Sequence, residues 1–121
     1  MIRGLGCDLC AISRMEKIMA DGRFLHRYFT EEERAYIAAR ARGAQTAAGI
    51  FAAKEALVKA LGTGFDGFAL ADIEIFSDEA GAPHVRLYRG AQARLAEIGA
   101  LNVMVSISHT KDAAMAVAAA E

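Results

Sequence analysis

The sequence predicts a single small α+β domain over residues 1–121, with N-terminal helices packed on antiparallel strands and hairpins. Segments with helical periodicity cluster in the first half of the chain, and segments with the alternation typical of strands cluster in the second half. The two kinds of segment do not alternate regularly, and this favours the α+β class. No repeat, linker or low-complexity segment divides the chain.

The chain begins with a predicted strand over residues 2–9. Ser13 and Glu16 have the spacing of a capping box, which predicts a helix that ends near Gly22. Residues 23–29 then form a predicted link to the next helix.

Thr30 and Glu33 make a second capping-box pattern, which opens a helix that is expected to stop near Gly43. A third and longer helix is predicted from about residue 45 to residue 61. The second half is expected to hold two hairpins with a helix between them: 72–76 with 84–88, the helix 91–98, and 103–108 with 113–119.

Charge and hydropathy exclude several classes of protein. The chain has 14 Lys and Arg against 15 Asp and Glu, and 55% of its residues are hydrophobic. This composition is too apolar for a disordered tail and too close to neutral for binding nucleic acid through overall charge. The longest apolar run, residues 113–120, is far shorter than the roughly 20 residues of a membrane span. We therefore expect a cytoplasmic protein without nucleic-acid or membrane partners, and the apolar surplus suggests a homo-oligomer.

Cys7 and Cys10 form a C-x-x-C motif, which alone could be a redox pair or half of a zinc site. There is no second cysteine pair, and the three histidines are scattered. If residues 2–9 form a strand, Cys7 is an ordinary small core residue, and this interpretation is favoured.

The third helix contains the most informative charges. Its segment AAGIFAAKEALVKAL, residues 47–61, can carry charge only at Lys54, Glu55 and Lys59, so the helix must be buried nearly all round. Glu55 and Lys59 share one face, whereas Lys54 lies about 100° around the axis. Glu55 and Lys59 could be a structural ion pair, but burying a carboxylate without adequate partners costs several kcal/mol. The pattern therefore slightly favours a functional site.

Asp8 stands near the end of the first strand among small and apolar residues, where its simplest role is to cap a turn or helix. Gly4 and Gly6 leave one strand face bare, so that a neighbouring element or a ligand can approach the backbone. Carboxylates from a strand and a helix, without a histidine and cysteine cluster, suit a hard divalent cation completed by water and phosphate oxygens. Magnesium is the natural candidate.

Two further groups of polar residues have open interpretations. His109, at the tip of the last hairpin beside Thr110 and Lys111, is either a phosphate contact or an ordinary surface histidine. Basic residues interleave with apolar ones between residues 14 and 27, which indicates either a docking face for an acidic helical protein or a solvated face whose methionines pack in the core.

Four segments in chain order are GLGCDLCAISRME, FAAKEALVKALGTG, DIEIF and VSISHT. Together they resemble the motifs of the holo-[acyl-carrier-protein] synthases, the small class of phosphopantetheinyl transferases, and the match spans essentially the whole chain. The resemblance implies the phosphopantetheinyl transferase fold and a homotrimer with sites between subunits. It also implies Mg²⁺-dependent transfer of 4'-phosphopantetheine from coenzyme A to a serine of apo acyl carrier protein, in fatty acid biosynthesis.

The resemblance assigns roles to individual residues. Asp8 and Glu55 would hold Mg²⁺ against the diphosphate and act in catalysis with Lys59, which would stabilise the phosphate under attack. Either Glu55 or a hydroxide near Asp8 would take the serine proton. The implied contacts to coenzyme A are Lys54, Lys59, Gly62, Thr63, Gly64, His109 and Thr110, and the implied contacts to the carrier protein are Arg14, Lys17, Arg23 and Arg27.

One position departs from the pattern of the family. Many relatives have an arginine just before the FAAKE phenylalanine, where this chain has Ile50. Either another basic residue, such as Arg42 or Lys54, compensates, or the affinity for coenzyme A is lower. Two other functions stay open: a non-catalytic oligomeric module that binds coenzyme A or a nucleotide, and a protein-interaction module whose buried charges only fix helix packing. Retention of the acidic pair, Lys59 and His109 argues against the first.

Overall fold

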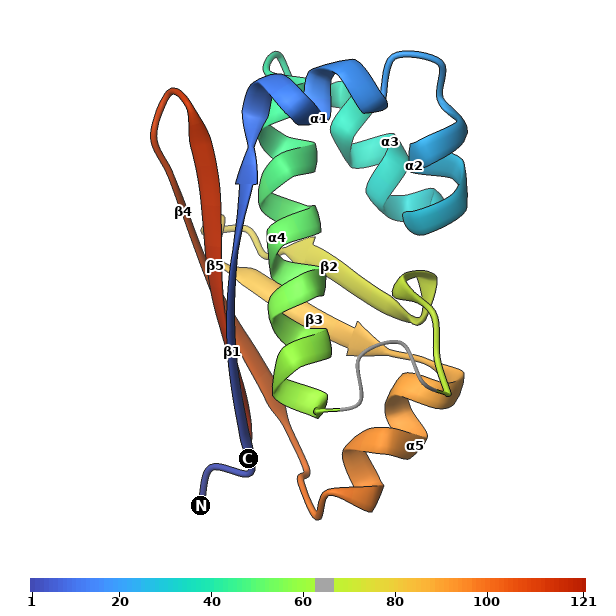
Figure 1. The fold of residues 1–121 in the computed structure, drawn as a ribbon, viewed down its shortest axis with the longest axis vertical. Coiled ribbons are helices and arrows are strands. Elements are labelled where there is room, and N and C mark those ends of the chain that lie inside the picture. The colour runs from blue at the N-terminus through green and yellow to red at the C-terminus, as the bar shows by residue number, and fades with distance from the viewer. Residues whose placement is uncertain (63–66) are drawn as a thin grey trace.

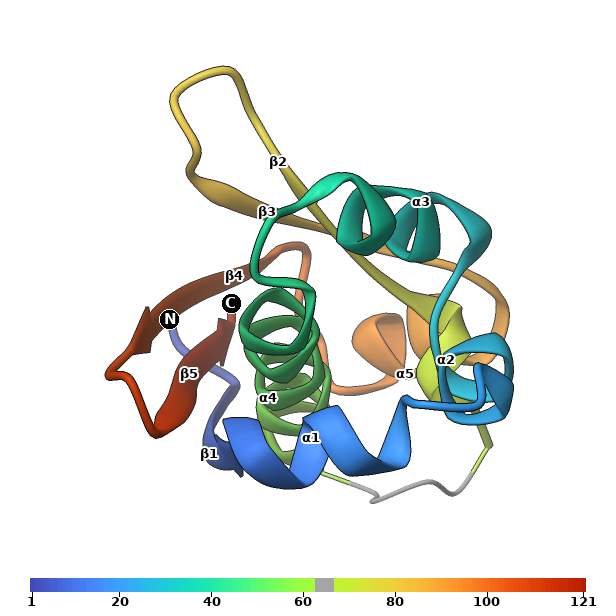
Figure 2. The ribbon, with the colours of Figure 1, turned by 90° about the horizontal axis from the view of Figure 1, so that it is seen from above.

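The longest helix, α4 (Gly43–Leu61), runs through the middle of the computed structural model, which describes residues 1–62 and 67–121. Figures 1 and 2 show the other elements arranged around this helix. Lys59 is its one largely exposed residue, with 56% of the side chain exposed. The prediction of a helix covered nearly all round is therefore confirmed.

Three antiparallel strands cover one side of α4. They are β1 (Gly4–Ala11), β5 (Ala113–Ala120) and β4 (Val103–His109), in the order β1-β5-β4. On β1 and β5 the face toward α4 is built largely from glycine and alanine. A Cβ atom at Gly4 or Gly6 would overlap a backbone carbonyl oxygen of α4. The two glycines therefore allow β1 to lie directly against the helix.

The chain after β1 forms two short helices, α1 (Ile12–Ile18) and α2 (Arg23–Tyr28), at one end of α4. The helix α1 begins directly after Ala11, which provides no side-chain cap, so the predicted capping box of Ser13 and Glu16 is wrong. The helix α2 occupies the predicted link. Its six residues are too few to display a helical period.

The helix α3 (Glu31–Ala39) follows, and here the predicted capping box is confirmed. The Glu33 amide donates to Thr30 Oγ1 at 3.2 Å, and the Thr30 amide donates to Glu33 Oε1 at 2.8 Å. The Glu33 side chain is nevertheless buried, unlike that of an ordinary capping residue on a surface helix.

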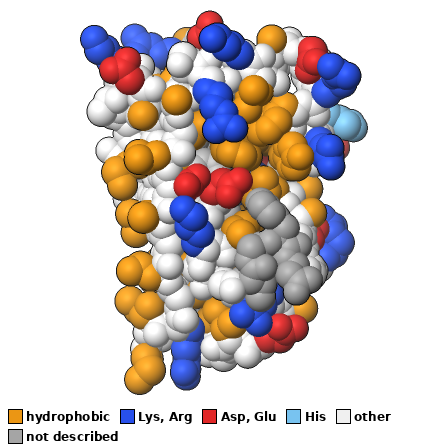
Figure 3. Space-filling model, in the orientation of Figure 1, with side chains coloured by type: hydrophobic (Ala, Val, Ile, Leu, Met, Phe, Trp, Pro, Cys, Tyr) orange, Lys and Arg blue, Asp and Glu red, His pale blue; other side chains and the backbone are white. Residues whose placement is uncertain are grey.

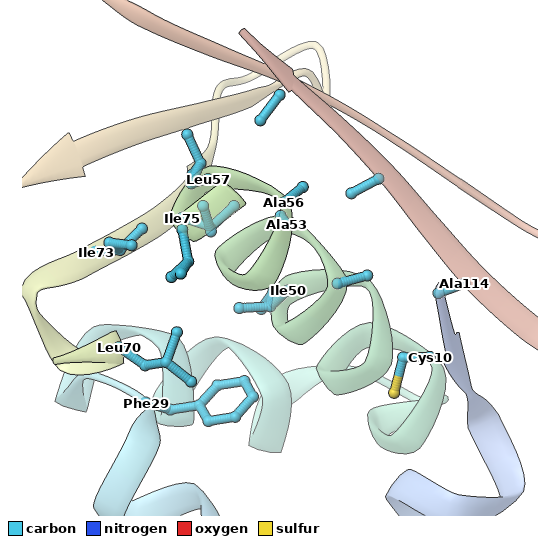
Figure 4. Packing of buried hydrophobic residues seen from close by; sticks show 14 of the residues in the cluster. Cys10, Phe29, Ile50, Ala53, Ala56, Leu57, Leu70, Ile73, Ile75 and Ala114 are labelled. Carbon is cyan, nitrogen blue, oxygen red and sulfur yellow. The ribbon is translucent and has the colours of Figure 1, made fainter. Parts of the chain in front are cut away.

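The second half of the chain contains a short 3₁₀ helix, η1 (Leu70–Asp72), the hairpin β2 (Ile73–Ser77) with β3 (Pro83–Leu87), and the helix α5 (Arg89–Glu97). Both predicted hairpins and the helix between them are confirmed, within a few residues at each end. Figure 4 shows residues of β2 and η1 packed on one side of α4, with Cys10 and Ala114 of the sheet on the other.

The arrangement is a single α+β unit, as predicted, with α4 as its core. No helix within residues 1–62 or 67–121 has the length and the apolar character that crossing a membrane requires.

Candidate active site

Asp8 and Glu55 come from β1 and α4, the two elements that the small residues hold in contact. Lys59 Nζ donates to Asp8 Oδ1 at 3.1 Å and to the carbonyl oxygen of Cys7 at 2.9 Å, so this lysine ties α4 to β1. Glu55 lies one helical turn before Lys59 on the same face. In Figure 3, acidic side chains touch each other beside a basic one on this side of the molecule. The structure thus brings together the three residues predicted to act in catalysis.

The electrostatics of this cluster are dominated by the two carboxylates. Burial raises the pKa of Glu55, and the neighbouring negative charge of Asp8 raises it further, while Lys59 opposes both effects. The Asp8 side chain is 24% exposed, so the cluster is open to solvent on one side. Two carboxylates next to one ammonium group leave an excess of negative charge, which favours the binding of a cation.

The donor set fits magnesium. Within residues 1–62 and 67–121, no group of three or more His, Cys, Asp or Glu is placed to enclose a metal ion. A magnesium site does not need such a cage, because Mg²⁺ is commonly held by one or two carboxylates together with substrate phosphates and water. Asp8 and Glu55 would supply the two carboxylates.

An apolar hollow of about 490 Å³, which we call the aromatic hollow, lies next to Glu55. Its rings pack on each other: the centroid of Phe24 lies 4.9 Å from that of Tyr28 and 5.3 Å from that of Phe51. Figure 3 shows hydrophobic side chains gathered beside the acidic ones. The residues that line it are Phe24, Arg27, Tyr28, Phe51, Glu55, Phe68, Ala69 and Leu70. An apolar side chain of another molecule could therefore be held beside the acidic pair.

All four basic residues predicted to contact a carrier protein are exposed on or beside α1 and α2: Arg14, Lys17, Arg23 and Arg27. Arg27 also lines the aromatic hollow. Arg23 differs, because its guanidinium pairs with Asp21 at 2.7 Å, and this hydrogen-bonded pair lowers the pKa of Asp21. Met15 is fully buried, so core packing is the correct interpretation for that methionine.

His109 lies on the other flank of α4, at the end of β4. It lines a second hollow of about 290 Å³ between α4 and the β2–β3 hairpin, which we call the hairpin hollow, and its Nε2 is 3.2 Å from Gln45 Nε2. The hairpin hollow and the aromatic hollow share no residue. Because β1 and β4 are opposite edges of the sheet, one chain does not bring His109 to the acidic pair.

Arg40 is a residue that the sequence reasoning missed. It follows α3 directly, packs over the ring of Tyr36 at 5.0 Å, and lines the hairpin hollow together with Ile50 and His109. Arg42, one of the two basic residues considered as a substitute for an arginine at position 50, lines neighbouring hollows instead. No local pattern marks Arg40, because only the packing of α3 against the hairpin brings it to this place.

The predicted contact of Lys54 with coenzyme A is wrong. Its side chain is fully buried, and Nζ lies 2.7 Å from Glu33 Oε1 and donates to three backbone carbonyl oxygens. The ammonium group is therefore used inside the protein and cannot replace the arginine missing at position 50.

The remaining predicted contacts have structural roles or lie outside the described residues. Gly62 ends α4 in the left-handed conformation, at φ 86°, and its amide donates to the preceding helical turn, so this amide is not free for a phosphate. Thr63 and Gly64 lie outside the described residues. Thr110 Oγ1 accepts from two backbone amides of the β4–β5 turn at 3.1 and 3.2 Å.

The C-x-x-C motif forms no disulfide. Cys7 is exposed, contrary to the prediction, and Cys10 is the core residue, where burial raises the pKa of its thiol. Residues three apart on a strand point to opposite faces, which separates the two thiols.

Known proteins resemble this chain over its full length. The sequence matches the family model of the 4'-phosphopantetheinyl transferase superfamily over residues 4–118. The holo-[acyl-carrier-protein] synthase of Solidesulfovibrio magneticus is 48% identical over 124 residues, which cover 100% of this chain and 99% of that protein. The crystal structure of the Neisseria meningitidis holo-[acyl-carrier-protein] synthase has a TM-score of 0.91 at 32% identity and covers 100% of this chain and 99% of its own. A Bacillus anthracis holo-(acyl-carrier-protein) synthase in complex with CoA (3',5'-ADP) has a TM-score of 0.83 at 35% identity, with 100% and 97% covered.

Proposed function

This chain belongs to the 4'-phosphopantetheinyl transferase superfamily, and from that premise we propose how its residues carry out the transfer. It is a phosphopantetheinyl transferase that moves 4'-phosphopantetheine from coenzyme A to a serine hydroxyl of apo acyl carrier protein and releases adenosine 3',5'-bisphosphate. The observation that carries the proposal is the meeting of Asp8, Glu55 and Lys59 where β1 lies against α4.

Asp8 and Glu55 are the proposed holders of Mg²⁺. When bound, the ion neutralises negative charge on the diphosphate of coenzyme A. Lys59 presents an exposed ammonium group beside both carboxylates, and it stabilises the phosphate oxygens as charge moves during the transfer. Since the two hydrogen bonds from Lys59 Nζ to β1 fix Lys59 and Asp8 relative to each other, these groups are oriented before the substrate arrives.

The hairpin hollow is the proposed site for the nucleotide phosphates of coenzyme A. Arg40, Gln45 and His109 supply side-chain donors there, and a guanidinium suits bidentate contact with phosphate. This hollow lies apart from the acidic pair within one chain. A second copy of the chain that supplied one of them would bring the two together for a single coenzyme A.

A homotrimer with sites between subunits is therefore part of the proposal. The face of the sheet that points away from α4 carries large exposed apolar side chains: Leu5 is 65% exposed, Leu9 72%, Met104 50% and Val117 39%. An apolar patch on all three strands suits burial against a second copy of the chain.

The carrier protein is proposed to dock on α1 and α2. Arg14, Lys17 and Arg27 are exposed there, and Arg27 lies at the aromatic hollow. An acidic carrier helix would be steered by these charges, with one apolar side chain in the hollow beside Glu55. The apparent affinity for the carrier should therefore fall as salt rises, because salt screens exposed charges.

The proposed setting is fatty acid biosynthesis in the cytoplasm. Cys7 and Cys10 are both free thiols, which suits a reducing compartment.

The test is to incubate the protein with coenzyme A, Mg²⁺ and an apo acyl carrier protein, and to follow the intact mass of the carrier. We expect a mass gain of one phosphopantetheine, lost with Glu55→Gln and retained with Glu79→Gln, which removes an exposed carboxylate of the hairpin turn. Binding of coenzyme A without any mass gain would support the non-catalytic module instead.

A further inference from the structure

Lys54 and Glu33 form a buried ion pair that has no part in the proposed transfer. Both side chains are 0% exposed, and Nζ lies 2.7 Å from Oε1. The Lys54 ammonium also lies 5.3 Å from the centroid of the Phe29 ring. Lys54 directly precedes Glu55 in the chain, so this buried charged pair adjoins the acidic cluster and needs a physical explanation.

The lysine connects the two walls of the aromatic hollow. Its Nζ donates to the carbonyl oxygen of Tyr28, on the α2 wall, at 3.1 Å. It also donates to the carbonyl oxygen of Leu70, on the η1 wall, at 3.0 Å, and to that of Ile73 at 2.7 Å. Tyr28 and Leu70 both line the hollow, and Glu55 follows Lys54 in the chain. One buried ammonium group therefore links the two walls through their backbone carbonyl oxygens and fixes the separation of the walls.

Glu33 holds that lysine in place. Its Oε1 accepts from the Thr30 amide at 2.8 Å and faces Nζ, and its Oε2 accepts from the Ile75 amide at 2.8 Å. The carboxylate thereby joins α3, β2 and α4 in one hydrogen-bonded group. Figure 4 shows Phe29 and Leu70 lying together on this side of α4, near Ile73 and Ile75.

Stability alone does not account for this group. Replacing a buried ion pair with apolar residues of similar volume is often neutral or even stabilising, because both charges are desolvated when the protein folds. A hydrophobic pair could fill the same volume, but it could not bind carbonyl groups from two separate walls at defined distances.

We propose that Lys54, held by Glu33, is a positioning residue that sets the width of the aromatic hollow and so places the docked carrier protein against Glu55. This inference rests on the docking role given to the hollow above. It predicts that the pair matters for the use of the carrier protein and not for the use of coenzyme A, whose proposed phosphate site lies on the other flank of α4.

The test uses the full chain with both charges removed together, Lys54→Met with Glu33→Gln, which leaves no unpaired buried charge. KM for the apo carrier protein and KM for coenzyme A are measured separately, and folding is monitored by circular dichroism. We expect the carrier KM to rise by about tenfold or more, since small misplacements of bound groups can change rates by up to about 100-fold. The coenzyme A KM should stay within about twofold, a difference too small to indicate a lost contact.

Three further variants make the outcome decisive. Lys54→Gln with Glu33→Gln also leaves no unpaired buried charge and keeps a donor for a carbonyl group. It should give a smaller rise in carrier KM, and it replaces the first double variant if that variant does not fold. Glu97→Gln breaks an exposed ion pair, 3.1 Å from Arg94, and should leave both KM values unchanged. Phe24→Ala removes a ring from the hollow and should raise the carrier KM.

An unchanged carrier KM in Phe24→Ala would show that the hollow does not dock the carrier, which overturns the docking proposal and this inference together. A raised carrier KM in Phe24→Ala, with an unchanged one in folded pair variants, would overturn the positioning role alone.

Discussion

At the scale of single residues, one sequence signal has two physical origins. Charges in the apolar segment 47–61 predicted a functional site, and the structure places Glu55 and Lys59 at the acidic cluster. Lys54 has the same signal, yet it pairs with Glu33 in the core. The sequence could not separate these cases, because the partner of Lys54 is 21 residues away and its burial depends on the packing of α3.

Glu55 is expected to reduce the stability of the metal-free protein at neutral pH. Burial and the Asp8 charge raise its folded pKa above the unfolded value of about 4.3, so the folded state binds this proton more tightly. The contribution of Glu55 to the free energy of unfolding is fully present below about pH 4, and it is lost as the pH rises through the folded pKa. Glu55→Gln should therefore raise the melting temperature by a few degrees near pH 7 without divalent cations, and by little near pH 4.

A matched variant tests the cause of that effect. Asp8→Asn removes the like charge, so the pH-dependent part of the difference should shrink when Glu55→Gln is made in this background. Equal melting temperatures of wild type and Glu55→Gln across the pH range would contradict the raised pKa.

Arg40 is expected to contribute to coenzyme A binding. Arg40→Ala should raise the KM for coenzyme A by about tenfold, because a charge-assisted hydrogen bond to phosphate contributes about 1.5–3 kcal/mol. Arg42→Ala is the control, since Arg42 lines other hollows. A larger rise in the coenzyme A KM with Arg42→Ala than with Arg40→Ala would show that Arg40 is not a phosphate contact.

At the scale of elements, the sequence predicted the structures that depend on contiguous residues. The Thr30–Glu33 capping box, the long helix and both hairpins were predicted because their periods and turn residues are contiguous. The pairing of β1 with β5 joins residues more than 100 positions apart and leaves no local pattern. The sequence therefore gave no indication that β5 lies in the middle of the sheet.

The contact between β1 and α4 is expected to be intolerant of even one methyl group. A Cβ at Gly6 would overlap the Ala56 carbonyl oxygen and lie 2.8 Å from Lys59 Cβ. Gly6→Ala should therefore destabilise the fold by about 1–3 kcal/mol and reduce transfer by separating Asp8 from Glu55. Gly43→Ala is the control, because its Cβ would make only ordinary contacts with Ile37, at 3.5 and 3.7 Å. Urea unfolding and transfer assays compare the two variants, and equal losses would contradict this account.

At the scale of the whole molecule, the proposed site is divided between two flanks of α4. The apolar surplus in the composition suggested an oligomer, and the exposed apolar face of the sheet supports that proposal. Which flank of one copy meets which flank of another depends on the assembly, and a single sequence contains no pattern for it.

Assembly is expected to be required for activity. Leu5→Glu with Leu9→Glu puts charges on the exposed apolar face of the sheet. This double variant should sediment as a monomer. It should also transfer phosphopantetheine about 100-fold or more slowly, because the reacting groups would no longer be held together. Mixing Glu55→Gln with His109→Ala protein should restore part of the activity, because some mixed sites would be intact. Full activity of a monomeric variant would exclude sites shared between subunits.

The most direct test of the central claim, that Asp8 and Glu55 share one divalent cation, is the binding of Mn²⁺ measured by electron paramagnetic resonance with coenzyme A present. The wild-type protein should bind one Mn²⁺ per site, displaced by Mg²⁺, and both Asp8→Asn and Glu55→Gln should weaken binding by about 100-fold or more, since even outer-shell changes cost about 10–100-fold. Binding of Mn²⁺ by both folded variants as tightly as by the wild type would contradict the account.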